Sequence, residues 1–278
     1  MSVEKLITPR TRAIVCMHYA GVACEMSELQ RIATQHGIAL VEDFAHGPFG
    51  SYRGQPMGTF GTLAALSFHG TKNFSCGEGG ALLINDPDLL ARAQVIREKG
   101  TDRRRFFAGE VDKYTWRDIG SSYVVADMLA AFLLGQLENR ESIQSRREYV
   151  HRAYETLLAD WAQQRGVRLP VIPADCVSAW HLYYLLLPEA RDQADFIAHM
   201  TRAGIGCAFH YVPLNTTPFG VQSGGVPGGC PVAEHAAARL VRLPLHAEIS
   251  EVELGRIVDV VRQWRPTGAV RVACASSS

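Results

Sequence analysis

The hydrophobic pattern of the chain alternates between two periods in its first hundred residues. Short apolar runs that suit buried strands fall at residues 13–18, 38–42, 62–68 and 80–85. Between the first two of these runs, the spacing of apolar residues predicts an amphipathic helix that begins at Ser27, with Ser27 and Gln30 as a capping box. Asp86 and Pro87 are typical of the start of another helix, which runs to about Lys99. Strands that alternate with helices favour a parallel α/β sheet.

The pattern changes after residue 100. Residues 101–118 have no clear period and predict a loop, and an uninterrupted helical pattern runs from about residue 126 towards 164. Further elements are expected as follows: strands at 181–187 and 206–211, and helices at 194–203, 231–240 and 251–264, the last capped by Ser250 and Glu253. We therefore expect a large domain at 1–145, a smaller α+β domain at 146–266 and a tail at 267–278.

Composition narrows the possible functions. The 278 residues carry 28 basic and 28 acidic side chains, so no overall charge favours nucleic acid or an anionic membrane. No apolar run is long enough for a membrane span, and the first residues lack an apolar secretion signal, which predicts a cytoplasmic protein. The seven cysteines show neither a disulfide framework nor zinc spacing, so we expect reduced thiols and no metal.

Polar or glycine-rich segments follow the expected strands. They are His18–Gly21, Glu42–His46, Ser67–Asn73 and Gly77–Gly80. Taken singly, each is typical of an ordinary turn, because a lone lysine after a strand is usually solvated and an aspartate there is usually a cap. The carboxyl ends of parallel strands, however, are where α/β sheets bind ligands. Their order and spacing together favour one shared site.

These segments belong to longer strings that occur in a fixed order. The strings are VEDFAHGPFGSYRGQPMGTFGTLAALSFHGTKNFSCGEGGALLIND, EKGTDRRRFFAGEVDKYTWRDIGSSY, AWHLYYLLL, HYVPLNTTP and CPVAEHAAARLVRLPL. In this order they resemble the DegT/DnrJ/EryC1/StrS family of sugar aminotransferases, from about residue 7 to residue 264. Within the family the resemblance is greatest to the dTDP-4-amino-4,6-dideoxygalactose transaminases. It implies an α/β fold, the aspartate aminotransferase-like fold type I of transferases that depend on pyridoxal 5'-phosphate (PLP), with the large domain incomplete at its N-terminus.

The resemblance also implies which residues hold the cofactor. Lys72 matches the lysine that binds PLP covalently, and its amine is suited to proton transfer. Asp43 matches the carboxylate that keeps the pyridine nitrogen protonated. His46 matches a residue that contacts the ring or its 3-hydroxyl, and Ser67 matches a phosphate-binding hydroxyl.

More distant residues are implied in the partner contact and in substrate binding. Ser121 and Ser122 match a segment that reaches the phosphate of the partner subunit in family dimers, which implies a homodimer. Substrate contacts are expected from four further residues: Arg103, Arg105, His210 and Tyr211. A solvated charged loop is an open alternative for the two arginines, and strand packing is an open alternative for His210 and Tyr211.

The implied reaction transfers an amino group, with L-glutamate as the expected donor, to a 4-keto-6-deoxy nucleotide sugar carrying dTDP. Such products serve the biosynthesis of lipopolysaccharide O-antigen and other cell-surface polysaccharides. Related PLP-dependent sugar dehydratases have histidine in place of the anchoring lysine, so Lys72 argues against that activity. The chain is shorter than family members at its N-terminus, where they supply a helix end that cradles the phosphate. A relative that keeps the fold without catalysis and pairs with another chain is therefore the alternative.

Overall fold

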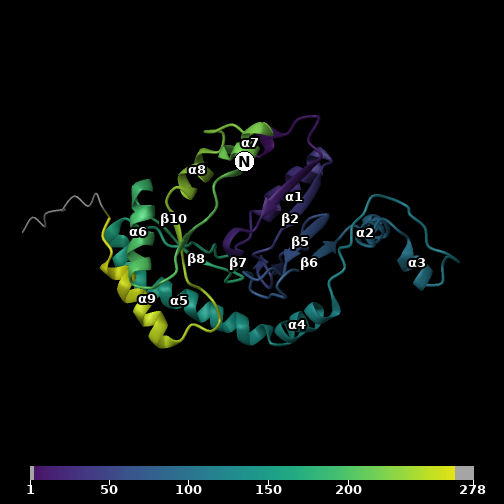
Figure 1. The fold of residues 1–278 in the computed structure, drawn as a ribbon. Coiled ribbons are helices and arrows are strands. Elements are labelled where there is room, and N and C mark those ends of the chain that lie inside the picture. Colours follow the sequence, from purple (N-terminus) through teal and green to yellow (C-terminus); the bar gives the residue numbers. More distant parts are fainter. Residues whose placement is uncertain (1–2, 267–278) are drawn as a thin grey trace, which may run out of the picture. The chain divides into compact units, whose positions relative to one another are not determined.

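The structure is a computed structural model that describes residues 3–266 (Figure 1). The chain divides into two compact units: the first comprises Met1–Gln144 and Ile172–His181, and the second comprises Ser145–Val171 and Leu182–Ser278. The expected tail at 267–278 lies outside the described residues. Within residues 3–266, every helix is either too short or too polar to span a bilayer.

A sheet with the strand order β1-β2-β5-β6 forms the centre of the first unit. Its strands are β1 (Ala13–Met17), β2 (Ala39–Asp43), β5 (Leu63–Ser67) and β6 (Gly80–Ile84). The first three strands are parallel, as the sequence predicts. The parallel arrangement does not extend to β6, which runs antiparallel to β5. A parallel neighbour would need a crossover, and the segment between these strands forms a turn instead.

Helix α1 (Met26–His36) covers one face of this sheet (Figure 1). Its apolar side chains Leu29 and Ile32 share a buried cluster with Leu40 of β2. The predicted capping box is wrong, because the helix begins one residue before Ser27 and has no side-chain cap. The opposite face of the sheet leaves apolar side chains exposed: Val15, Met17 and Leu82.

Nine further elements of the described residues complete the first unit. They are η1 (Glu4–Leu6), η2 (Tyr19–Gly21), β3 (Ser51–Tyr52), β4 (Gln55–Pro56), η3 (Pro87–Leu89), α2 (Leu90–Arg97), α3 (Arg103–Phe107), α4 (Asp127–Glu138) and β7 (Cys176–Val177). Asp86 caps η3 by accepting from the Asp88 amide at 3.0 Å, as predicted. The segment expected to be a loop contains the short helix α3. The single long helix expected from residue 126 is broken at Asn139, which leaves the helical conformation and ends α4.

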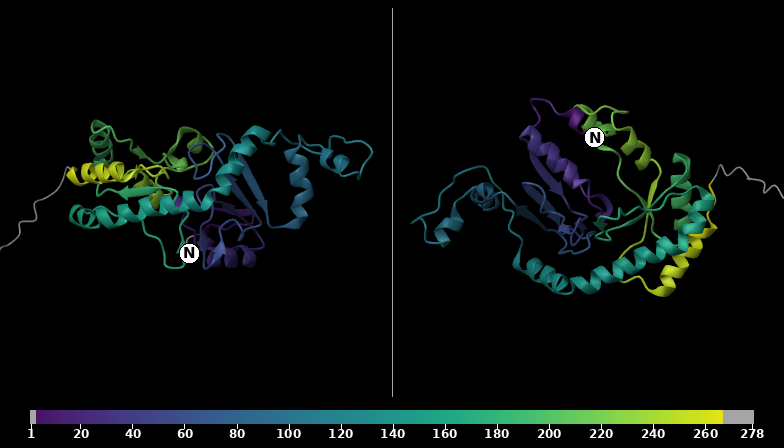
Figure 2. Two further views of the ribbon diagram at one scale, coloured as in Figure 1. Left: turned by 90° about the horizontal axis from the view of Figure 1, so that it is seen from below. Right: turned by 180° about the vertical axis from the view of Figure 1, so that it is seen from behind.

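The second unit packs helices around a sheet with the strand order β8-β10-β9 (Figure 2). Its elements are α5 (Arg140–Arg165), β8 (Tyr183–Leu186), α6 (Ala190–Arg202), β9 (Ala208–Phe209), η4 (Leu214–Thr216), α7 (Pro218–Gln222), α8 (Pro231–Ala237), β10 (Leu240–Leu243) and α9 (Glu251–Gln263). Helices α5 and α9 lie side by side, joined by Arg262 and the Leu157 carbonyl. The capping box of Ser250 and Glu253 is confirmed. Strand β10, by contrast, begins where a helix was expected to end.

Candidate functional site

Three neighbouring strands end at the same side of the sheet, and two of them carry residues expected to bind the cofactor. His18 follows β1, Asp43 ends β2 and Ser67 ends β5. The His18 amide donates to the Asp43 carbonyl oxygen at 3.0 Å, and the Phe44 amide donates to the Ala65 carbonyl oxygen at 3.1 Å. These backbone bonds fix the register of the edge. Asp43 and Ser67 therefore lie on adjacent strands.

Asp43 is a half-buried carboxylate with few partners. Its Oδ1 accepts from the Ala45 amide at 3.1 Å. Among residues 3–266, that amide is the one group found to donate to this side chain. A half-buried carboxylate that accepts one hydrogen bond from the protein can still bind a cationic ligand group such as a protonated pyridine.

Lys72 lies in the turn that follows β5, on the same edge of the sheet. Its side chain is half-buried, and its amide donates to the His69 carbonyl oxygen at 2.9 Å. The base of the turn is closed by the Gly70 amide, which donates to the Gly77 carbonyl oxygen at 2.9 Å. Ser67 Oγ accepts from the His69 amide at 3.3 Å, so its own proton can be donated to an anion. The end of β5 and the turn after it therefore carry a hydroxyl and an amine at the same end of the sheet as Asp43.

Behind Asp43, the buried carboxylate of Glu42 binds the adjoining segments together. Its Oε1 accepts from the amides of Phe60 and Gly61, both at 2.7 Å, and its Oε2 accepts from the Gly58 amide at 2.8 Å. His18 Nε2 lies 2.9 Å from Oε2. Burial opposes the charge of Glu42, but the hydrogen bonds from His18 and the amides outweigh it and lower the pKa of the carboxyl. Glu42 is thus a structural anion that supports the strand end carrying Asp43.

The tight turn around Glu42 depends on Gly58. This residue has φ of 88°, and an added Cβ would lie 2.8 Å from the Phe44 ring. Any side chain here would be strained and would also clash with that ring. Sequence reasoning missed this support, because nothing in the residue pattern indicates which segments meet a buried glutamate.

His46 is buried and stacks on a second imidazole, His181, which the sequence analysis did not single out. The ring centroids are 3.9 Å apart and the planes are inclined by 21°. His181 Nδ1 lies 2.8 Å from Oδ1 of Asn73, the residue after Lys72. The signal for this contact is the histidine within AWHLYY, but its position beside His46 depends on the tertiary fold.

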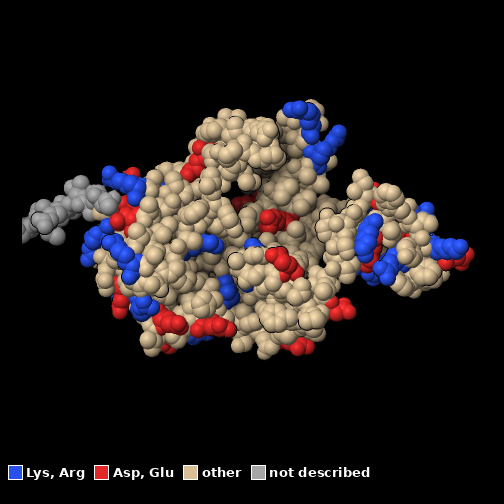
Figure 3. Space-filling view, in the orientation of Figure 1, with Lys and Arg blue, Asp and Glu red and all other residues tan. Residues whose placement is uncertain are grey.

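The structure keeps the other residues expected in the first unit away from the strand ends. Ser121 and Ser122 are exposed, and the Lys99 amide donates to the Ser121 carbonyl oxygen at 3.1 Å. Arg103 lies over the Phe107 ring at 5.1 Å. Arg105 is exposed and forms an ion pair with Glu110 at 3.0 Å. Acidic side chains are mixed with basic ones around α3 (Figure 3), so this segment is not a continuous basic patch.

His210 and Tyr211 belong to the second unit, immediately after β9. His210 is buried, whereas the Tyr211 side chain is 76% exposed. Their ring centroids lie 4.5 Å apart. An exposed aromatic side chain beside a buried imidazole is able to bind a ligand.

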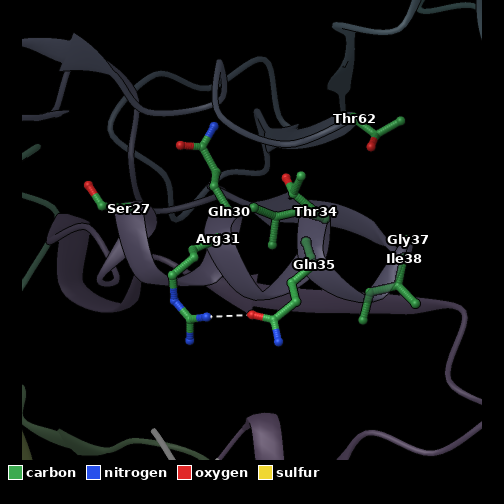
Figure 4. Close-up of a pocket in the computed structure, with 10 residues that line it drawn as sticks. Ser27, Gln30, Arg31, Thr34, Gln35, Gly37, Ile38 and Thr62 are labelled. Carbon is green, nitrogen blue, oxygen red and sulfur yellow. Dashed lines mark hydrogen bonds between the residues drawn. The ribbon is translucent and has the colours of Figure 1, made fainter.

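A shallow hollow of about 700 Å³ lies beside α1 (Figure 4). Polar side chains line it, and Arg31 donates to Gln35 at 2.7 Å across its wall. Neither Lys72 nor Asp43 contributes to this hollow. It lies between α1, the start of β2 and the residue before β5, and it is not part of the strand-end site.

Comparison with known proteins shows to which family the chain belongs. The family model of the DegT/DnrJ/EryC1/StrS aminotransferases matches residues 1–262. The chain belongs to this family. The resemblance seen in the sequence is thereby confirmed at the level of the family, and so is its cofactor, because aminotransferases of this family depend on PLP.

Several relatives are similar over nearly the whole chain. The dTDP-3-amino-3,4,6-trideoxy-alpha-D-glucose transaminase of Streptomyces venezuelae is 33% identical, over 94% of this chain and 66% of that protein. The spore coat polysaccharide biosynthesis protein SpsC of Bacillus subtilis is 29% identical, over 94% of this chain and 69% of that protein. The chain thus spans about two thirds of the length of these curated relatives.

Solved structures confirm the fold class. DesV of Streptomyces venezuelae superposes with a TM-score of 0.83 at 33% identity, covering 94% of this chain and 67% of that chain. PseC of Helicobacter pylori superposes with a TM-score of 0.84 at 24% identity, covering 94% of this chain and 68% of that chain. The chain therefore has the α/β fold type I of PLP-dependent sugar aminotransferases.

Proposed function

We propose that this protein transfers an amino group from L-glutamate to a 4-keto-6-deoxy sugar carried on dTDP, in the biosynthesis of a cell-surface polysaccharide. The observation that carries the proposal is that Asp43, Ser67 and the Lys72 turn all lie at the carboxyl ends of the adjacent parallel strands β2 and β5. Family membership supports the aminotransferase chemistry. The relative from Streptomyces venezuelae, a dTDP-amino-sugar transaminase, supports the substrate class.

Each residue at the strand ends has a distinct task. Bound PLP supplies an electron sink for the carbon that gains or loses the amino group. Lys72 Nζ anchors the cofactor and, when free, takes and returns the substrate proton. Asp43 holds the proton on the pyridine nitrogen, and Ser67 Oγ donates a hydrogen bond to the phosphate. His46 contacts the ring or its 3-hydroxyl.

Substrate and partner contacts are proposed for the remaining residues. Arg103 and Arg105 are exposed cations suited to a diphosphate, although Arg105 would have to leave Glu110 to bind it. His210 and Tyr211 would contact the sugar. Ser121 and Ser122 would complete the phosphate site of a second copy, which is consistent with their exposure.

We infer a homodimer from the apolar surface that continues from this serine segment onto α4. The exposed fraction is 80% at Trp116, 85% at Ile119, 85% at Met128 and 61% at Phe132. Such a concentration of large exposed apolar side chains is typical of a protein interface. Ser121 and Ser122 lie within the same stretch of chain. A dimer contact that buries these apolar side chains would therefore also bring the two serines to the other subunit.

The direct test is to supply ¹⁵N-glutamate and a dTDP-4-keto-6-deoxyhexose to the PLP-loaded protein. We expect ¹⁵N in the sugar product at C4, detected by mass spectrometry and NMR. A Lys72→Ala variant serves as the control and should transfer none. If the protein holds PLP on Lys72 but leaves this sugar and its 3-keto isomer without ¹⁵N, the substrate assignment is wrong. If PLP does not bind, the non-catalytic alternative is favoured.

A further inference from the structure

Two imidazole rings lie stacked beside the strand ends, and the proposed function uses only one of them. The centroids of His46 and His181 are 3.9 Å apart, and their planes are inclined by 21°. Both residues are almost fully buried, with exposed fractions of 4% and 7%. His181 comes from a distant part of the sequence that folds back into the first unit.

Asn73 fixes the orientation of the His181 ring. Asn73 Nδ2 donates to the Ala179 carbonyl oxygen at 2.6 Å and to Gln144 Oε1 at 3.2 Å, so the amide group can point only one way. Asn73 Oδ1 then faces His181 Nδ1 at 2.8 Å. An amide oxygen has no proton to donate, so His181 must carry a proton on Nδ1. The hydrogen bond thus selects both the rotation and the tautomer of the ring.

The backbone next to His181 is also held in an unusual conformation. Trp180 has φ of 52°, in the left-handed region that a tryptophan rarely adopts. Its amide donates to Ser178 Oγ at 3.0 Å. Ordinary packing of an aromatic ring requires neither a fixed nitrogen nor a strained neighbour. The segment is therefore built to present His181 in one orientation.

We propose that His181 is a positioning residue that stacks on His46 and holds its ring in the orientation that meets PLP. This rests on the proposed function, in which His46 contacts the cofactor ring or its 3-hydroxyl. Asn73 immediately follows Lys72 in the chain. The contacts from Asn73 through His181 to His46 therefore couple the ring that faces the cofactor to the backbone of the anchoring lysine.

The first test uses the protein without PLP, labelled with ¹⁵N-histidine. Long-range ¹H–¹⁵N spectra should show a protonated Nδ1 on His181, and the His46 ring protons should be shifted upfield by the stacked ring. In His181→Ala the upfield shift should disappear. A wild-type His181 with its proton on Nε2 alone, or His46 shifts that do not change in His181→Ala, would overturn the proposal. This test stays decisive even if PLP fails to bind Lys72, which would refute the proposed function separately.

The second test separates positioning from plain structural support. His181→Phe keeps a stacking ring, whereas His181→Asn keeps a polar group and loses the stack. We expect PLP binding to weaken about tenfold in His181→Ala and His181→Asn, and less than about threefold in His181→Phe. The first two variants should also shift the pH at which the absorbance of bound PLP changes. His199→Ala, which removes one hydrogen bond to the Val260 carbonyl in the second unit, is the control and should change neither. Equal losses in the Phe and Ala variants, with an unchanged absorbance titration, would overturn the positioning role.

Discussion

Replacing Glu42 by glutamine tests whether this buried carboxylate stabilises the strand end that carries Asp43. The carboxylate is fully buried and accepts from three amides at 2.7 to 2.8 Å, and His18 Nε2 lies 2.9 Å from it. Glutamine keeps the shape but turns one acceptor oxygen into an NH₂ group. In either orientation that NH₂ faces at least one backbone N–H at hydrogen-bond distance, so a buried donor loses its partner.

The magnitude follows from these contacts. An unsatisfied buried donor costs about 1–3 kcal/mol, and the remaining bonds lose the assistance of the negative charge. We therefore expect Glu42→Gln to lower the free energy of unfolding by about 3 kcal/mol. With a urea m-value of about 3 kcal/mol per M, the midpoint should fall by about 1 M.

The assay is urea unfolding of the protein without PLP, followed by circular dichroism. Glu28→Gln is the matched control, because Glu28 is a partly exposed glutamate on α1 that pairs only with Arg31 among the described residues. Its urea midpoint should stay at the wild-type value. If Glu42→Gln also unfolds at the wild-type urea midpoint, the bonds from Glu42 to the 58–61 turn do not stabilise the fold and the reasoning is refuted.

Further predictions concern pH, the cofactor partner and the dimer. Because the pKa of Glu42 is lowered from its ordinary 4.5, its stabilisation is present above that pH and is lost below it; the urea midpoint of wild type should fall there, and that of Glu42→Gln should fall less. Asp43→Asn should abolish amino transfer while leaving the circular dichroism spectrum unchanged, and near-normal turnover would contradict its role. Phe132→Asp should convert a dimer to a monomer in light scattering, whereas Val252→Asp, on an exposed position of α9, should leave the mass unchanged. A monomeric wild type with full PLP affinity would contradict the dimer.

Local sequence patterns predict the strands of the first unit because each is a short apolar run ended by polar residues. The same patterns cannot show the direction of an individual strand, so they do not reveal that β6 runs antiparallel to β5. They also miss a break such as Asn139, where a single residue leaves the helical conformation inside an otherwise helical pattern. Intrinsic preferences are weak at such points, and tertiary packing decides them.

The expected cofactor residues followed from a resemblance carried by ordered motifs, and the strand ends do bring Asp43 and Ser67 together. The supporting residues could not be found in this way. Glu42 meets amides of the 58–61 turn, and His181 reaches His46 from a segment beyond α5. Such contacts depend on how distant segments fold, and a single sequence contains no pattern for them.

The central claim is that Lys72 is the residue that holds PLP. The most direct measurement is to add PLP to the protein, reduce with borohydride, digest, and map the pyridoxyl group by peptide mass spectrometry. The account predicts a single modified site on the peptide that contains Lys72, and none in Lys72→Ala. A pyridoxyl group on Lys99 or Lys113 instead, with Lys72 unmodified, would contradict it.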